Sequence, residues 1–443
     1  MKKAAFLSLG CKVNSYETEA MRGMFERAGY EIVDFKDTAE VYVVNTCTVT
    51  NMADRKSRQM LHQARKRNPE AVIAAVGCYV QAAEEELLSD SAVDLVVGNN
   101  KKSDIVVMVE RFMDSNRKEE LVSDIRTEME YEELAVNTTM EKTRAFIKIQ
   151  DGCNRFCSYC IIPYVRGRVR SRDEQDILTE ISLLAAKGYK EYVLTGIHIS
   201  SYGTDRIPEE RAGSNFPLAE LITKVGRIPG IERIRVGSLE PRIITEEFVQ
   251  AIVKVEQFCP HFHLSLQSGS NTVLQRMNRK YSAEEYYDKV LLLQRYFDHP
   301  AFTTDIIVGF PGEKPEEFAE TMSFVKKIGF SHIHVFKYSK REGTKAAVMP
   351  EQVPEDIKHQ RSKLLILASE EMSKEYKALF MGKIEKILVE EEMIINGITY
   401  QTGHSERYLK LAFEGSEDLT NRVIPTRVIG TLTEEILLCE ITH

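Results

Sequence analysis

The chain has 443 residues with a formal net charge of −8, and 43% of its residues are apolar while 28% are charged. At roughly 100–200 residues per domain, this length suggests two to four domains. The acidic balance excludes a protein that binds nucleic acid through a basic composition overall. No apolar run approaches the roughly 18 residues of a membrane span. The apolar stretch 4–9 is also shorter than the roughly 7–15 residues that a signal peptide needs, so we expect a cytoplasmic protein without a membrane anchor.

The first hundred residues alternate between strand and helix patterns. Strands are predicted at 4–9, 41–44, 71–76 and 94–97, and helices at 16–28, 53–67 and 81–88. Ser15 is the expected N-cap of the first helix. Such alternation predicts a parallel sheet covered by helices. The charged stretch 114–143 shows little pattern and is predicted to be a linker or an exposed connection.

A second α/β series follows, and the tail then changes character. Helices such as 173–187 and 315–328 separate six strands, predicted at 145–149, 191–195, 233–237, 263–266, 304–308 and 332–336. This pattern predicts a partial (β/α) barrel of about six units. A helix at 354–379 leads to short strands at 383–389, 398–402, 408–413, 423–431 and 435–442, which suit a small antiparallel β-barrel. The predicted fold class is α/β, with domains at 1–125, 139–372 and 375–443.

The strongest chemical signal is the group Cys153, Cys157 and Cys160, just after the first strand of the second series. Three thiolates can hold three irons of a four-iron, four-sulfur cluster and leave the fourth iron open to another ligand. Zinc is the alternative, but a structural zinc site needs four ligands. No fourth Cys or His lies close by in the sequence.

A second group depends on the fold, because Cys11, Cys47 and Cys78 each lie just beyond the end of a predicted strand. In a parallel sheet those ends lie along one edge, so three cysteines distant in sequence can meet. The alternative is three unrelated thiols, since cysteine is often a core residue. Cys259 and Cys439 match no such pattern and are predicted to be structural thiols.

The Cys153 motif resembles that of radical S-adenosylmethionine (SAM) enzymes. In that superfamily the open iron binds the amino and carboxylate groups of SAM, and an electron from the cluster cleaves the sulfonium to give a 5′-deoxyadenosyl radical. The resemblance also implies an electron donor such as flavodoxin or ferredoxin. The predicted partial barrel is the usual scaffold of the superfamily.

Further motifs resemble the methylthiotransferase family over nearly the full chain. They are 9–14 (LGCKVN), 45–50 (NTCTVT), 77–79 (GCY), 150–172, 265–270 (SLQSGS), 277–281 (MNRKY) and 305–313 (DIIVGFPGE). The resemblance implies two [4Fe–4S] clusters, one for radical generation and an auxiliary one that holds or supplies sulfur. A second SAM supplies the methyl group, and a C-terminal TRAM-like barrel binds RNA.

Within that family, Cys-Lys-Val-Asn and Asn-Thr-Cys-Thr-Val-Thr are most similar to the branch that acts on N6-threonylcarbamoyladenosine in tRNA. The isopentenyladenosine branch usually has Cys-Gln-Met-Asn at the first position, and the ribosomal-protein branch usually has Cys-Pro-Lys-Asn. A few residues carry this choice, so the two other substrates remain alternatives. A rival of another class is a non-catalytic iron–sulfur protein that transfers electrons or acts as a scaffold.

The resemblance implies several cofactor contacts beside the clusters. Tyr159 is expected against the adenine of SAM, and Thr195 and Gly196 near the methionyl amino group. The other implied contacts are Glu240, Gln267, Arg279, Ile307 and Phe336. On sequence alone Glu240, Gln267 and Arg279 could equally form structural polar contacts, and Ile307 and Phe336 are more typical of core positions.

Two basic segments could meet tRNA phosphates, which need local positive charge even in an acidic protein. One is the loop with Arg166, Arg168 and Arg170, which we predict to bind substrate, followed by Arg172. The other is a helix with Arg55, Lys56, Arg58, Arg65, Lys66 and Arg67, which could also be a solvated face. The tail 376–443 has seven Lys plus Arg and eleven Asp plus Glu, so its charge does not favour it as the main RNA anchor.

Overall fold

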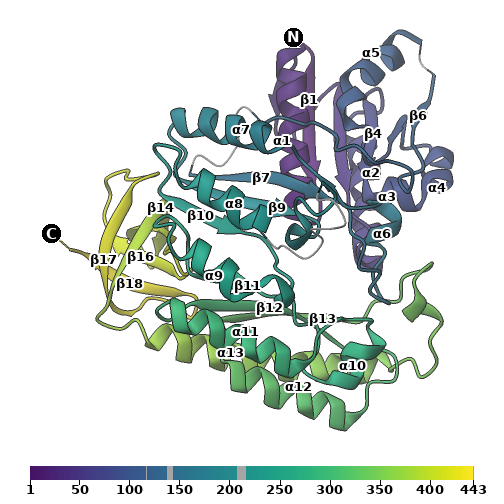
Figure 1. Ribbon diagram of the computed structural model, residues 1–443. Coiled ribbons are helices and arrows are strands. Elements are labelled where there is room, and N and C mark those ends of the chain that lie inside the picture. Colours follow the sequence, from purple (N-terminus) through teal and green to yellow (C-terminus); the bar gives the residue numbers. More distant parts are fainter. Residues whose placement is uncertain (116, 137–142, 207–215, 443) are drawn as a thin grey trace.

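The computed structural model describes residues 1–115, 117–136, 143–206 and 216–442 (Figure 1). A parallel sheet, a partial barrel and a closed barrel follow one another along the chain. Within the described residues, none of the helices combines the length and apolar character needed to cross a lipid bilayer.

The N-terminal part is a six-stranded parallel sheet, which confirms the predicted alternation. Its order across the sheet is β2 (Glu31–Val33), β1 (Lys3–Ser8), β3 (Val41–Thr46), β4 (Val72–Gly77), β5 (Leu95–Val97) and β6 (Glu119–Leu121). The two edge strands were not predicted, because each is three residues long, begins with Glu and lacks the buried apolar run that marks the equally short β5. The buried strands β3 and β4 occupy the centre, where both faces are covered.

Helices cover both faces of this sheet. On one face pack α1 (Lys12–Arg27) and α5 (Ile105–Ser115), and on the other α2 (Asn51–Arg67), α3 (Cys78–Ala82) and α4 (Glu84–Ser89). The predicted start of the first helix is wrong. Cys11, and not Ser15, is its N-cap, because the chain turns directly from β1 into the helix.

The segment predicted as an exposed connection is partly buried. Leu134 and Val136 pack against Tyr16 and Ala20 of α1, and β6 extends the first sheet. Residues 137–142 lie outside the described part of the chain.

The central part contains the six predicted parallel strands, curved into a partial barrel. These are β7 (Arg144–Asp151), β9 (Glu191–Gly196), β10 (Arg233–Val236), β11 (His261–His263), β12 (Ala301–Val308) and β13 (His332–Lys337). Isolated bridges such as Leu239 to Leu264 join β10 to β11, and the short β8 (Arg170–Ser171) pairs antiparallel with β7.

The helices of the central part pack outside its strands around one large core. They are α7 (Glu174–Ala186), α8 (Phe216–Val225), α9 (Glu246–Ile252), α10 (Asn271–Arg276), α11 (Ala283–Tyr296), α12 (Pro315–Ile328) and α13 (Glu355–Ala378). The short helix α6 (Ile162–Val165) instead packs with Cys78 at the junction with the first domain. Short 3-10 turns lie at Lys102–Asp104, Ile199–Ser201, Pro241–Ile243 and Lys345–Val348. The boundary predicted at 372–375 falls inside α13, which is one continuous helix.

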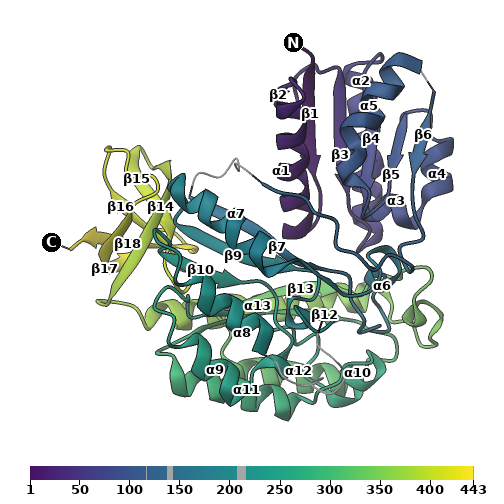
Figure 2. The ribbon, with the colours of Figure 1, turned by 45° about the horizontal axis from the view of Figure 1, so that its top comes forward.

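The tail forms the predicted closed barrel, with strands in the order β14 (Ile384–Ile395), β15 (Ile398–His404), β16 (Lys410–Glu414), β18 (Ile436–Ile441) and β17 (Val423–Thr431). All pairs are antiparallel except β16 with β18, which is parallel. Arg233 and Arg235 of β10 donate to the carbonyls of His404, Ser405 and Glu406 at 2.6–2.8 Å. These contacts place the tail at the amino ends of the central strands (Figure 2).

Candidate active site: two thiol triads at a domain junction

The thiols of Cys11, Cys47 and Cys78 gather at one edge of the first sheet, as the strand ends predict. Cys11 follows β1, Cys47 follows β3 and Cys78 follows β4, and these three strands are neighbours. The thiols are close enough that the charges of Cys78 and Cys11 would each raise the pKa of Cys47. We call these three residues the auxiliary triad.

Two glycines let the backbone bring these thiols together. Gly10 has φ of +95°, and a Cβ there would lie 2.7 Å from the Sγ of Cys47. Gly77 has φ of +96°, and a Cβ would lie 2.4 Å from the Oδ1 of Asn45. Any side chain at either position would displace the cysteine loops, since L-residues rarely adopt these angles.

The second group, Cys153, Cys157 and Cys160, lies in the loop between β7 and α6, and we call it the radical triad. The amide of Cys160 donates to the carbonyl of Cys157 at 3.0 Å, and that of Cys153 donates to the carbonyl of Gly167 at 3.0 Å. Gly152 has φ of +71°, and a Cβ there would overlap the carbonyl of Arg168. The loop is therefore held from both sides, and its thiols face one another within electrostatic range.

Burial keeps most of these thiols protonated in the absence of metal. It raises the pKa of Cys47 and of Cys160 to about 12 and that of Cys153 to about 11. A structural thiol could remain in this state, but thiolate ligation requires that a bound metal displace the protons. Three converging thiols without a disulfide partner match the donor set of an iron–sulfur cluster.

The two triads adjoin across the domain junction. Ile161, the residue after Cys160, packs with Val165 against Cys78. Figure 2 shows the first sheet with the carboxyl ends of its strands directed toward the central barrel, beside α6. The Nδ2 of Asn99 strengthens this contact by donating to the carbonyl of Val165 at 2.7 Å and to the Sγ of Cys78 at 3.7 Å.

A buried charge network fixes the junction, and its centre, Glu17, was not predicted. The carboxylate of Glu17 pairs with Arg166 at 2.5 Å, Lys148 at 2.8 Å and Lys102 at 3.3 Å. Burial would raise the pKa of Glu17, but the charges of Arg166, Lys102 and Lys148 hold it well below its usual range. A lone Glu on a helix gives no sequence signal for this role, because its partners lie far along the chain.

The structure places Arg166 in this network and not on a phosphate-binding surface. Its side chain is 0% exposed, and its Nε donates to the Sγ of Cys78 at 3.1 Å. Arg170 is also buried and donates to the carbonyls of Arg166 and Arg168. The prediction that Arg166 and Arg170 contact RNA therefore conflicts with their burial, whereas Arg168 is exposed and its substrate role stays a prediction.

Arg341, which was also not predicted, makes a second set of polar contacts between the central barrel and the first domain. Its guanidinium donates to Asp54 at 2.6 Å, to Asn51 at 2.7 Å and to the hydroxyl of Thr48 at 2.7 Å. Thr48 is the residue after Cys47, so a loop of the central barrel braces the auxiliary triad directly.

Comparison with known proteins assigns this arrangement to a family. Residues 3–98 match the uncharacterized protein family UPF0004, and residues 147–325 match the radical SAM superfamily. The chain is 41% identical to the threonylcarbamoyladenosine tRNA methylthiotransferase MtaB of Bacillus subtilis (strain 168), over 97% of this chain and 94% of that protein. The chain belongs to the radical SAM tRNA methylthiotransferase family.

The chain is also similar to a relative named for another tRNA substrate and to a solved radical SAM structure. The chain is 36% identical to the tRNA-2-methylthio-N(6)-dimethylallyladenosine synthase of Acetivibrio thermocellus, over 95% of this chain and 87% of that protein. The radical SAM methyltransferase TsrM of Kitasatospora setae has a TM-score of 0.58 at 13% identity, covering 78% of this chain and 77% of that structure. At that identity the likeness concerns the fold alone.

As a radical SAM methylthiotransferase, the protein uses two [4Fe–4S] clusters and SAM, and its donor sets fit them. Each triad supplies three thiols, and in each an arginine side chain contacts a thiol, which suits the negative charge of a thiolate-bound cluster. In the radical triad, the Nη1 of Arg279 lies 3.3 Å from the Sγ of Cys157. Arg279 thus contacts a thiol that would hold the cluster, and its predicted contact with SAM stays a prediction.

The other polar contacts expected for SAM are placed around the same loop. Glu240 is 5% exposed and accepts from Arg155 at 2.6 Å and from His198 at 2.9 Å. Because Arg155 lies between Cys153 and Cys157, Glu240 braces the radical loop through it. Gln267 adopts φ of +72° and pairs with Ile306 at the end of β12, and its contact with SAM stays a prediction.

The smaller and apolar residues predicted near SAM also end barrel strands. Thr195 and Gly196 close β9, and a Cβ on Gly196 would lie 2.9 Å from the Oε1 of Gln150. Tyr159 and Ile307 are partly buried and pack against one apolar cluster. Phe336 is 47% exposed, so the reading of Phe336 as a core residue is wrong, and an apolar surface is available on the inner face of β13.

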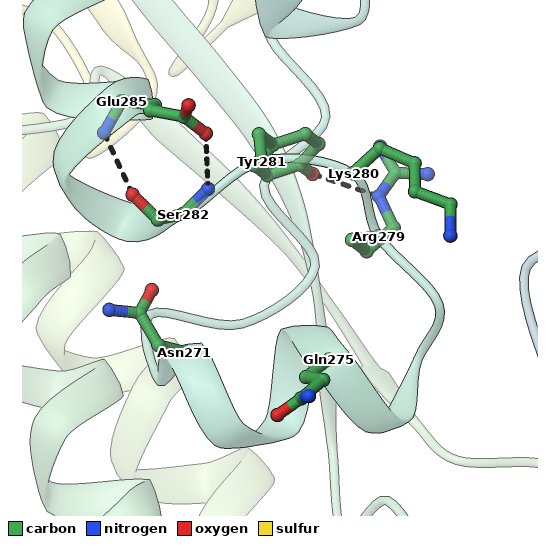
Figure 3. Close-up of a pocket in the computed structure, with 7 residues that line it drawn as sticks. All are labelled: Asn271, Gln275, Arg279, Lys280, Tyr281, Ser282 and Glu285. Carbon is green, nitrogen blue, oxygen red and sulfur yellow. Dashed lines mark hydrogen bonds between the residues drawn. The ribbon is translucent and has the colours of Figure 1, made fainter.

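A cavity of about 350 Å³ lies at α10 and the start of α11 (Figure 3), and its lining residue Arg279 also contacts Cys157 of the radical triad. Arg279 and Tyr281 line it together with Asn271, Gln275, Lys280, Ser282 and Glu285. Ser282 and Glu285 bond each other as the capping box of α11. Most of its polar groups therefore serve local structure, and among its described lining residues Arg279 is the one with a hydrogen bond to a cysteine of the radical triad.

The basic residues of α2 form two groups, one with protein partners and one that is exposed. Arg58, Arg65 and Arg67 bond to Glu86, Asp94 and the carbonyl of Phe35, which favours a structural role for them. Arg55, Lys56 and Lys66 are exposed. Cys259 and Cys439 are buried, as expected for structural thiols.

Proposed function

We propose that this protein thiomethylates C2 of N6-threonylcarbamoyladenosine, at the position 3′ of the anticodon in tRNA. The observation that carries the proposal is the junction of the two triads, where Cys78 packs against the residue that follows Cys160. Identity of 41% to a protein named for this substrate supports the branch, against 36% to a protein named for the dimethylallyl substrate.

The two cysteine triads have different roles in the proposed reaction. When bound, the cofactors supply a radical from SAM, sulfur from the auxiliary site and a methyl group from a second SAM. Cys153, Cys157 and Cys160 hold the first cluster, with Arg279 at the Sγ of Cys157. Cys11, Cys47 and Cys78 hold the second, and Arg166 orients Cys78. The target carbon is unactivated, so radical chemistry suits it better than acid–base catalysis.

The remaining partners belong to the same proposal. A flavodoxin or ferredoxin would supply electrons, and the reaction would take place in the cytoplasm, where tRNA and reductant are available. The TRAM-like barrel would bind the tRNA, with Arg168 and the exposed lysines of α2 as phosphate contacts. Recognition of RNA by shape and stacking does not require a basic surface throughout.

Mass analysis of tRNA nucleosides from a deletion strain tests the substrate. We expect the methylthio form of N6-threonylcarbamoyladenosine to disappear while its precursor remains, and the wild-type gene to restore it. Loss of the methylthio form of isopentenyladenosine instead would assign the other branch. Failure of the reduced protein to release 5′-deoxyadenosine from SAM would favour a non-catalytic iron–sulfur protein.

A further inference from the structure

A group of metal-ligating side chains lies on the inner face of the central barrel and includes none of the six triad cysteines. Three neighbouring strands contribute one residue each: His263 from β11, Asp305 from β12 and His334 from β13. Asp305 lies directly opposite His334 in the register of β12 with β13. Alternate residues of these strands, such as Phe302 and Ile306, belong to the buried core with residues of the outer helices, so the three polar residues share the other face.

The donor atoms of these residues converge. One ligand atom from each of the three lies within 4.8 Å of the others. The Nε2 of His263 is 3.3 Å from the Oδ2 of Asp305. Atoms at such separations surround a volume that one metal ion can occupy, since metal–ligand bonds of about 2.0–2.2 Å set the donors roughly 3 Å apart.

The ring of His263 is already oriented for ligation. Its Nδ1 hydrogen-bonds to the hydroxyl of Thr303 at 3.0 Å, which directs Nε2 toward Asp305. Among the described residues, that Nε2 is buried and has no hydrogen-bond partner. A ligating histidine characteristically uses its second nitrogen in such an outer hydrogen bond. A histidine that served only to pair with Asp305 would be expected to satisfy Nε2 with a well-directed hydrogen bond.

We propose that His263, Asp305 and His334 bind one divalent transition-metal ion, of the zinc or ferrous type. Two imidazoles and one carboxylate are the donor set that such borderline ions prefer. Three protein ligands leave further coordination positions open on the side of the barrel interior. The site contains no cysteine, so its ligands are distinct from those of both iron–sulfur triads.

The open positions would take oxygen ligands. The expected adenine contacts are Ile307 and Phe336, which follow Asp305 and His334 by two residues on the same face of β12 and β13. The ion would therefore lie closer to the amino ends of these strands than the residues expected to contact SAM. The carboxylate and urea oxygens of a threonylcarbamoyl group suit an ion at this depth, whereas a dimethylallyl group offers no donor. This part of the inference rests on the proposed function.

Zinc binding tests the ion site without tRNA. The protein with both clusters assembled is treated with a chelator, dialysed against buffered Zn²⁺ and analysed for zinc and iron together. We expect one zinc per chain in the wild type, and a zinc affinity at least about tenfold weaker in Asp305→Asn and His334→Ala, the scale on which even supporting residues act. The matched control is His332→Ala, whose ring lies 4.6 Å from that of His334 on the same strand, and it should keep its zinc.

Iron content makes the result interpretable, because a misfolded variant would lose iron as well as zinc. Absence of stoichiometric zinc from the wild type, or equal zinc in Asp305→Asn and wild type at equal iron, would overturn the site. These outcomes would leave the proposed methylthiolation untouched.

A second measurement tests the substrate ligand by linkage. If tRNA oxygens bind the ion, tRNA carrying threonylcarbamoyladenosine must tighten zinc binding by the same factor by which zinc tightens tRNA binding. An unmodified transcript of the same tRNA should have no such effect. Equal zinc affinity with both RNAs would overturn the substrate contact.

Discussion

The radical triad and the auxiliary triad have the same three ligands but are built in different ways. The radical triad lies within eight consecutive residues, and local backbone hydrogen bonds hold its loop. The cysteines of the auxiliary triad follow three different strands and are each more than thirty positions from the next along the chain, so its geometry exists only when the sheet has formed. The radical triad therefore depends on the conformation of one loop, whereas the auxiliary triad depends on the folding of the whole first sheet.

The arginines beside the triads sharpen this difference. Arg279 approaches Cys157 from within the same barrel, whereas Arg166 approaches Cys78 from the other side of the domain junction. Changes at the junction should therefore impair the auxiliary site first and leave the radical site intact.

Single cysteine substitutions should give the largest separation between the two sites. Cys47→Ala removes one auxiliary ligand without touching the radical loop, so we expect 5′-deoxyadenosine release to continue while methylthiolation falls below detection. Cys157→Ala should abolish both, because radical generation precedes sulfur transfer. Product analysis by mass spectrometry and chromatography measures both activities. Full methylthiolation by Cys47→Ala would contradict the assignment of the auxiliary triad.

Loss of the Glu17 carboxylate should have the next largest effect. Glu17→Ala removes the carboxylate partner of the buried Lys102 and leaves Asp151 as the carboxylate shared by Lys148 and Arg166, and breaking a buried pair by removing one partner costs about 3–5 kcal/mol. We expect the free energy of unfolding, measured with denaturant, to fall by that amount. Glu19→Ala is the control on the same helix, because its pair with Arg22 is partly exposed and should contribute at most about 1 kcal/mol.

Much of this architecture follows from patterns in the sequence. The strands of the central barrel and of the tail were predicted within a few residues, because buried strands such as β9 and β12 combine β-branched residues with clear turn signals. The positions of Cys11, Cys47 and Cys78 followed from the same patterns, since strand ends share an edge in any parallel sheet.

The errors concern contacts between distant segments. Four alternating arginines after the radical triad suggested an RNA surface, yet Arg166 and Arg170 are buried against Glu17, Asp151 and backbone carbonyls. A charged residue is assigned to solvent by default, and only the fold shows that a second domain covers this loop. The sequence alone favoured a core position for Phe336, which is 47% exposed. An apolar residue is assigned to the core by default, and the sequence does not show which face of a barrel strand it occupies.

Lysine substitutions of Arg279 and Arg166 should have smaller effects, and each should slow a different one of the two activities. Arg279→Lys keeps the charge but loses the forked contacts to Cys157, Tyr281 and Ser265, since an ammonium cannot reproduce a planar fork. We expect 5′-deoxyadenosine formation to slow by about tenfold, equivalent to about 1.4 kcal/mol. Arg166→Lys should slow methylthiolation by a similar factor and leave 5′-deoxyadenosine formation unchanged. Equal effects of both variants on both activities would show that the sites are not separable at this level.

The loss of stability in acid tests whether charged Glu240 holds the radical loop through Arg155. It is the smallest effect that we expect. Burial would raise the pKa of Glu240, but the hydrogen bond from His198 and the charge of Arg155 hold that pKa at about 2. The unfolded chain therefore takes up this proton first as the pH falls, and the stabilisation present above about pH 4.5 is lost between that value and about pH 2. By pH 4 the loss from this group should reach about 0.8 kcal/mol. Denaturant unfolding of the cluster-free protein at pH 7 and pH 4 measures it, with Glu240→Gln as the matched variant that cannot titrate. The difference in unfolding free energy between wild type and Glu240→Gln should shrink by this amount at pH 4, and an unchanged difference would mean that Glu240 does not carry its charge into the folded radical site.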